Sequence, residues 1–142
     1  MSKTSLNFPA GAWVTLLQKA YKLLDAIASD GIVIPRWSLG GGTVLMFHNN
    51  HRISKDIDIF IPDPQFLAYI NPRSGGRAED VTSDYKENAE YLKLFLSEGE
   101  IDFVASPALT KNPFEEHEVL GRNILLETPI EIVAKKLWYR GD

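Results

Sequence analysis

At 142 residues and 16.0 kDa, the chain is long enough for one domain with a sizeable core and too short for two full domains. Its 44% hydrophobic and 24% charged residues exclude a disordered or fibrous protein, and the net charge of −4 argues against a generally basic nucleic-acid-binding surface. The absence of cysteine excludes disulfides, thiol catalysis and thiolate metal sites. The sequence contains no membrane-length apolar run and no signal peptide, so we expect a soluble cytoplasmic protein without a membrane partner.

The N-terminal half alternates between helix and strand signals. Apolar residues recur at helical spacing after Pro9, and a later stretch is rich in alternating β-branched residues. Four residues, Gly40 to Thr43, separate a short apolar run from a second helix. In chain order, we expect a helix over 13–27, a strand over 32–39, a short helix from Val44 that ends by Asn49-Asn50, a strand over 56–61 and a helix over 64–70.

The C-terminal half carries more strand signal. Residues 71–82 hold Pro, Ser and Gly and are the most loop-like stretch. Beyond them we expect a hairpin of residues 91–96 and 100–105, a strand over 123–126 and a closing helix from Pro129. This mixed order predicts an α/β (α+β) fold with one mixed central sheet flanked by helices. Three tryptophans are expected in the core: Trp13, Trp37 and Trp138.

Three short motifs lie close together: Gly40-Gly41-Gly42-Thr43, Arg52-Ile53-Ser54 and Asp56-Ile57-Asp58. Glycines between a strand and a helix let the backbone approach a phosphate, with the helix amides pointing at it. Two aspartates two residues apart on a strand share one face, about 6.6 Å apart at Cα. Such a pair raises the pKa of both carboxyls unless a cation lies between them. Mg²⁺ or Mn²⁺ suits these hard oxygen ligands beside a phosphate-bearing substrate.

These motifs resemble the signature of the DNA polymerase β-like nucleotidyltransferase superfamily. Within it, the stretch Gly40 to Leu45 followed by Arg52 to Phe60 looks like the AbiEii family, the abortive-infection and toxin nucleotidyltransferases that include the MenT toxins. The resemblance covers most of the chain from Trp37 onward. It implies a polymerase β-like core and transfer of a nucleoside monophosphate from an NTP to an acceptor.

The resemblance also implies roles for individual residues. Nucleotide binding would fall to Gly41, Gly42, Thr43, Arg52 and Ser54, and metal binding to Asp56, Asp58 and Asp102. Asp102 would complete the metal site or act as general base. The C-terminal helix is similar to the family's Ala–x–Lys–Leu segment, which makes Lys136 the residue expected to reach the phosphates.

Partners and domain organisation also follow from the resemblance. Toxin relatives modify RNA, so RNA is the expected acceptor, and an antitoxin is an expected partner. The family continues past this segment with an Arg-Asp helix and a helical C-terminal lobe. We therefore expect residues 1–142 to form the N-terminal lobe alone.

Other interpretations stay open. The chain could be a non-catalytic lobe that binds a nucleotide or a partner protein, or a plain interaction module that binds no nucleotide. Arg52 and Lys55 could be surface charges or phosphate contacts, and Ser54 could merely cap a turn. His48 and His51 have a spacing that suggests zinc, but no third ligand stands near them in the sequence, which favours surface histidines.

Overall fold

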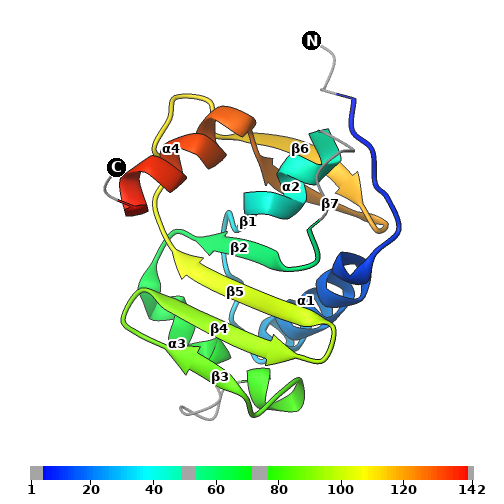
Figure 1. Ribbon diagram of the computed structural model, residues 1–142. Coiled ribbons are helices and arrows are strands. Elements are labelled where there is room, and N and C mark those ends of the chain that lie inside the picture. The colour runs from blue at the N-terminus through cyan, green and yellow to red at the C-terminus, as the bar shows by residue number, and fades with distance from the viewer. Residues whose placement is uncertain (1–4, 49–53, 72–76, 141–142) are drawn as a thin grey trace.

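A computed structural model describes residues 5–48, 54–71 and 77–140, and Figure 1 shows their arrangement. The helices are α1 (Ala12–Ser29), α2 (Gly41–His48), α3 (Leu67–Ile70) and α4 (Pro129–Arg140), with 3-10 turns η1 (Pro64–Phe66) and η3 (Arg77–Asp80). The strands are β1 (Ser38–Gly40), β2 (Ile57–Ile61), β3 (Tyr85–Glu87), β4 (Tyr91–Leu96), β5 (Gly99–Ala105), β6 (Phe114–Val119) and β7 (Arg122–Glu127).

The described strands form one seven-stranded sheet in the order β3-β4-β5-β2-β1-β7-β6. β1 runs antiparallel to β2 and parallel to β7, and β2 runs parallel to β5. β4 and β5 form the predicted hairpin, and β6 and β7 form a second one. The prediction of one mixed central sheet with flanking helices is therefore confirmed.

The core lies between α1 and the central strands. Alternate residues of β2, Ile57, Ile59 and Ile61, are fully buried, and α1 contributes Leu16 and Leu17 to the same cluster. In Figure 1, α1 lies behind β2 and β5, and α4 lies on the other side of the sheet. β2 thus presents its isoleucines to the core and its remaining residues to the face that α4 partly covers. No helix among the described residues has the length and apolar content required to cross a bilayer.

Three expectations about strands need correction. Of the strand predicted over 32–39, only Ser38 and Leu39 pair in the sheet, within β1, because Pro35 lacks an N–H donor and Arg36 has a left-handed φ of 51°. β3 and β6 were not predicted. Both are edge strands, and the charged Phe114–Val119 segment of β6 lacks the apolar alternation that marks a half-buried strand.

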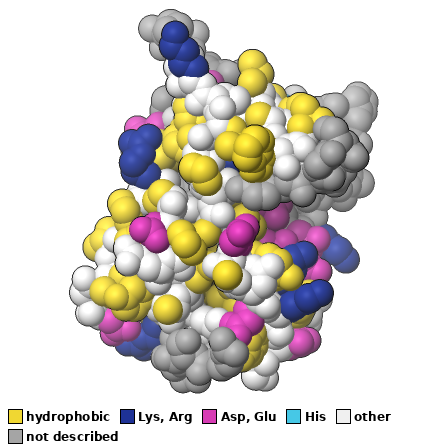
Figure 2. Space-filling model, turned by 90° about the vertical axis from the view of Figure 1, so that its left-hand side faces the viewer, with side chains coloured by type: hydrophobic (Ala, Val, Ile, Leu, Met, Phe, Trp, Pro, Cys, Tyr) yellow, Lys and Arg dark blue, Asp and Glu magenta, His cyan; other side chains and the backbone are white. Residues whose placement is uncertain are grey.

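α4 is oriented opposite to its hydrophobic pattern. Its apolar residues Ile130, Val133, Leu137 and Trp138 are exposed, whereas Glu131 and Lys135 are buried. Figure 2, viewed from the side where α4 lies in Figure 1, shows hydrophobic side chains on the surface there. The expected core position of Trp138, which is 70% exposed, is therefore wrong, while that of Trp13 is confirmed. Glu127 of β7 lies beneath α4, so Glu131 and Lys135 pack inward together with the buried Ile132.

Candidate active site

The glycine turn connects β1 to α2 and is bracketed by two carboxylates. Gly41 has a φ of +67°, and a Cβ added there would overlap the Asp58 carboxylate, lying 2.8 Å from its Cγ. A Cβ added at Gly40 would overlap Glu127, at 2.6 Å from its Cδ. Glycine is therefore required at Gly41, where the backbone conformation and the Asp58 carboxylate both exclude a side chain, whereas a side chain at Gly40 would displace the Glu127 carboxylate.

Thr43 and Ser54 connect the glycine motif to the acidic motif. The Thr43 hydroxyl donates a hydrogen bond to the carbonyl oxygen of Asp56 and lies 3.2 Å from the Ser54 hydroxyl. Thr43 is fully buried. Both predicted nucleotide-binding hydroxyls thus fix the chain where it enters β2. The spacing between the two motifs is explained by this packing.

Asp56 lies one residue before β2. Its Oδ1 accepts a hydrogen bond of 2.9 Å from the backbone N–H of Glu100, at the start of β5. The carboxylate is therefore held in one orientation. Its charge raises the pKa of both Asp58 and Asp102, which shows that the three acids share one electrostatic environment.

Asp58 and Asp102 lie side by side on the sheet. They are direct partners in the parallel register of β2 and β5, and Lys93 on β4 is the next partner of Asp102. On the other side, Asp58 is paired with Gly40 of β1. Gly40 has no side chain, and the Glu127 carboxylate at the end of β7 fills the space beside it. One row across five strands therefore carries Lys93, Asp102, Asp58, Gly40 and Glu127.

The acid pair is poorly compensated. Burial raises the pKa of Asp58 to about 6, against a hydrogen bond with Asp102 that lowers it, and Asp56 raises it further. Burial and then the charge of Asp58 raise the pKa of Asp102 to about 7, while Lys93 lowers it. Asp102 Oδ1 is buried and has no hydrogen-bond partner among the described residues. A cation beside this pair would favour its ionised form.

A cavity of about 410 Å³ opens over this row of side chains. Asp58, Gly41 and Gly42 form part of its wall, and α4 contributes Lys135 and Lys136. The structure therefore brings the predicted glycines, one acid of the pair and Lys136 to one cavity. Asp102 is the register partner of Asp58, and Asp56 lies two residues before it. Arg52 and His51 lie outside the described residues.

Sequence reasoning missed three charged residues that line this cavity: Lys93, Glu127 and Lys135. Glu127 and Lys135 are also buried, at 1% and 5% exposure. Lys135 Nζ donates to Glu127 Oε2, and burial raises the pKa of Glu127 to about 7, against the lowering effect of Lys135. The apolar stripe of α4 had predicted that Ile130, Val133 and Leu137, rather than Lys135, face the core. The only usable signal was the Glu131 and Lys135 pair at i, i+4 spacing.

The donor set fits a divalent cation in its chemistry. Among the described residues, no three His, Asp or Glu side chains are arranged as a metal site. The adjacent carboxylates of Asp58 and Asp102, with one buried oxygen lacking a donor, nevertheless need positive charge. Carboxylate oxygens are the ligands that Mg²⁺ and Mn²⁺ prefer.

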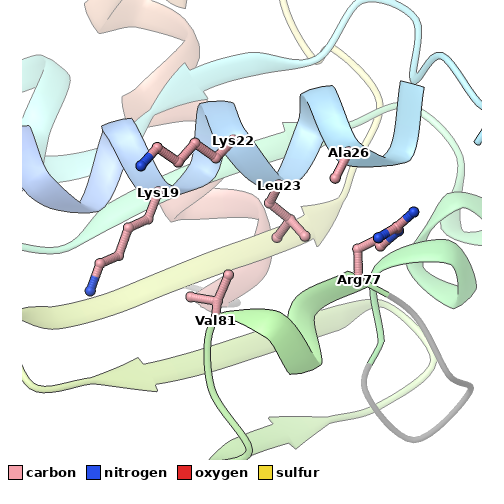
Figure 3. Close-up of a pocket in the computed structure, with 6 residues that line it drawn as sticks. All are labelled: Lys19, Lys22, Leu23, Ala26, Arg77 and Val81. Atoms are coloured by element: carbon pink, nitrogen blue, oxygen red, sulfur yellow. The ribbon is translucent and has the colours of Figure 1, made fainter. Parts of the chain in front are cut away.

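A second cavity, of about 430 Å³, lies between α1 and η3 (Figure 3). Its wall includes Lys19, Lys22 and Arg77. Lys19 is paired with Glu98 at 3.0 Å, and Arg77 with Asp30 at 2.7 Å. Among the residues that the structure describes, its wall contains neither a carboxylate that could hold a metal ion nor a glycine at the start of a helix, so the cavity over the acid pair is the stronger candidate for a nucleotide bound with a metal ion.

The raised carboxyl pKa values predict how stability depends on pH in the metal-free protein. Asp58 and Asp102 have folded pKa values of about 6 and about 7, above the unfolded value of about 3.9. Between about pH 4 and pH 7 the folded chain thus binds more protons than the unfolded chain, so the free energy of unfolding should fall as pH rises. Asp102→Asn should flatten this slope in urea titrations with a chelator. An unchanged slope, equal to that of the exposed-site control Asp84→Asn, would contradict the assignment.

This architecture, with a glycine turn facing an acid pair on a mixed sheet, is that of the nucleotidyltransferases. A crystal structure of a candidate nucleotidyltransferase from Thermotoga maritima matches with a TM-score of 0.56 and 14% identity, covering 89% of this chain and 86% of that chain. The family described as Nucleotidyl transferase AbiEii toxin, Type IV TA system, matches residues 22–140. The chain belongs to this AbiEii family of toxin nucleotidyltransferases. A comparison with curated proteins gives no match.

Proposed function

We propose that this chain is a metal-dependent nucleotidyltransferase that transfers a nucleoside monophosphate from an NTP to an acceptor hydroxyl, with RNA as the acceptor. One observation carries the proposal. The adjacent carboxylates of Asp58 and Asp102 lie in register on β2 and β5, and Asp58 packs against Gly41 in the wall of a cavity that Lys93, Lys135 and Lys136 also line.

The roles of the residues follow from their placement. Gly41 and Gly42 would receive the triphosphate where α2 begins, and Lys136 would neutralise phosphate charge. Asp58 and Asp102 would hold Mg²⁺ or Mn²⁺, with Asp56 as the third acid fixed by the Glu100 amide. The bound ion would supply Lewis-acid stabilisation of the charge that develops on the phosphate oxygens.

The proposed transfer is a displacement at the α-phosphorus. The acceptor oxygen forms a bond to that phosphorus, the bond to the bridging oxygen of the β-phosphate breaks, and pyrophosphate leaves. The acceptor hydroxyl proton must go to a base. Asp102 is the proposed base, because its carboxylate lies beside Asp58 in the register of β2 and β5 and an ionised carboxylate can accept that proton.

The partner proposals rest on family membership. A toxin of a type IV toxin–antitoxin system has an antitoxin, and we propose that this chain has one. That residues 1–142 correspond to the family's N-terminal lobe stays a prediction. The exposed apolar side chains of α4 support it, because a lobe packed on that helix would cover them.

Incubation of the chain with each labelled NTP, Mg²⁺ and total RNA tests the proposal. We expect label transfer by the wild type and none by Asp56→Ala, whose side chain is tied to the start of β5. Asp84→Ala, an exposed aspartate, serves as the control and should transfer label normally. Calorimetry with the four NTPs separates the alternatives. Mg²⁺-dependent binding without transfer would favour a non-catalytic nucleotide-binding lobe, and no binding would favour an interaction module.

A further inference from the structure

Lys135 is buried between two glutamates at the wall of the cavity. Its Nζ donates to Glu127 Oε2 and lies 3.4 Å from Glu131 Oε2. All three side chains are at most 5% exposed. Burying an unpaired ammonium costs free energy, so the two glutamates hold the ammonium of Lys135 in one position.

Glu131 is itself held by the chain segment before β6. Its carboxylate accepts hydrogen bonds from the backbone N–H groups of Leu109 and Thr110, at 2.9 Å each, and from the Thr110 hydroxyl at 2.5 Å. These bonds lower the pKa of Glu131, against the effect of burial. Glu131 is therefore a firmly anchored anion. The position of Lys135 is then set by Glu127 on its other side.

Glu127 connects Lys135 to the glycine turn. Its carboxylate occupies the space where a side chain on Gly40 would be, directly before the cradle formed by Gly41 and Gly42. Its Oε1 is buried and has no hydrogen-bond partner within the described part of the chain. A fold that needed only packing here would be as stable with apolar residues. The unsatisfied carboxylate therefore indicates a role in the cavity.

The charge balance of the cavity indicates which ligand Lys135 meets. A triphosphate would enter a space bordered by the carboxylates of Asp58 and Glu127, and it needs cations from the chain as well as from a metal. An ammonium has three N–H donors. Glu127 accepts a hydrogen bond from one of them, and Glu131 is an ion-pair partner at 3.4 Å. The ammonium lies 4.2 Å from the centre of the Phe60 ring, and both Phe60 and Lys135 line the cavity, so an N–H group that Glu127 does not use is available to a ligand there.

We propose that Glu127 is a positioning residue of the nucleotide site, which holds the Lys135 ammonium where it contacts the phosphates of a bound nucleoside triphosphate. This inference rests on the proposed function and extends it, because the phosphate-binding lysines would then be Lys135 together with Lys136. Glu127 acts through Lys135 and does not itself touch the nucleotide.

A double-mutant cycle tests this coupling. NTP·Mg²⁺ affinity is measured by calorimetry for the wild type, Glu127→Gln, Lys135→Met and the double variant. Each single change should weaken binding about tenfold, the effect of one charge-assisted hydrogen bond. The double variant should bind no more weakly than Lys135→Met, because Glu127 acts only through Lys135. Glu127→Asp, which keeps the charge, should retain part of the affinity.

Two exposed residues provide matched controls: Glu118→Gln and Lys111→Met should bind as the wild type does. Unchanged affinity in Glu127→Gln, or losses that multiply in the double variant, would overturn the inference while leaving the proposed function intact. A wild-type chain that binds none of the four NTPs would overturn both.

Amine acylation provides a measurement that needs no nucleotide. Lys135 should react several-fold faster in Glu127→Gln than in the wild type, whereas the adjacent Lys136 should react at the same rate in both and serves as the internal reference. Adding NTP·Mg²⁺ should protect Lys135 in the wild type. Equal Lys135 rates in the two proteins, or no protection of a lysine in a chain that binds NTP, would contradict the assignment. Circular dichroism verifies that each variant is folded.

Discussion

Asp58→Asn should reduce nucleotidyl transfer on the order of a thousandfold and, in the same protein, raise the thermal stability of the metal-free chain. Activity falls because Asp58 is the acid that both lines the cavity and faces the Gly41 turn. Stability rises because the substitution removes a buried charge that is adjacent to Asp102. A gain of about 1 kcal/mol would raise the Tm by roughly 4 °C.

The two readouts together distinguish a functional acid from a structural one. Transfer is measured with labelled NTP and RNA, and the Tm is measured at neutral pH with a chelator. Asp84→Asn, at an exposed position before β3, should change neither quantity. Full activity of Asp58→Asn, or a lower Tm, would show that Asp58 is not a strained carboxylate kept for function.

Gly41→Ala should destabilise the chain by about 2–4 kcal/mol and remove activity. The φ of +67° disfavours any side chain, and the new Cβ would lie 2.8 Å from Cγ and 3.2 Å from Cβ of Asp58. Asp58 has a short side chain on a central strand, so it cannot withdraw without leaving the cavity. Chemical denaturation gives the stability change, and label transfer gives the activity.

Gly121→Ala is the matched control for the backbone conformation. Gly121 has a φ of +81°, and a Cβ added there meets nothing within 4 Å. Its substitution should therefore cost only the conformational strain, about 1 kcal/mol, and leave activity unchanged. An equal loss in the free energy of unfolding of the two variants would show that the overlap with Asp58 does not destabilise Gly41→Ala.

The sequence predicted those helices and strands that local residue patterns determine. The apolar spacing of α1, the alternation of β2 and the hairpin of β4 and β5 are local patterns, and each predicted element formed. The glycine and acid motifs could likewise be recognised from the sequence, since side chains two residues apart on a strand point to the same face. The prediction of Asp102 beside Asp58 needed the resemblance to a family, because 44 residues separate them in the chain.

The orientation of α4 was decided only by the tertiary structure. Its sequence pattern places Ile130, Val133 and Leu137 on one stripe, and such a stripe ordinarily packs inward. In the structure these residues are exposed and Lys135 is buried, because the sheet face beneath the helix offers Glu127. Hydrophobic periodicity depends on the sequence of one element alone. It therefore cannot predict that a polar residue on a distant strand will pair with a residue of the helix.

The sequence by itself thus determined α1, β2, the β4–β5 hairpin, the glycine turn and the acids of β2, since these depend on residues a few positions apart. The tertiary structure decided that Gly40 and Gly41 leave space for Glu127 and Asp58, and that Lys135 reaches the cavity. Those contacts join strands that are distant in the chain. The register and order of the sheet set them, and both depend on the packing of the whole domain.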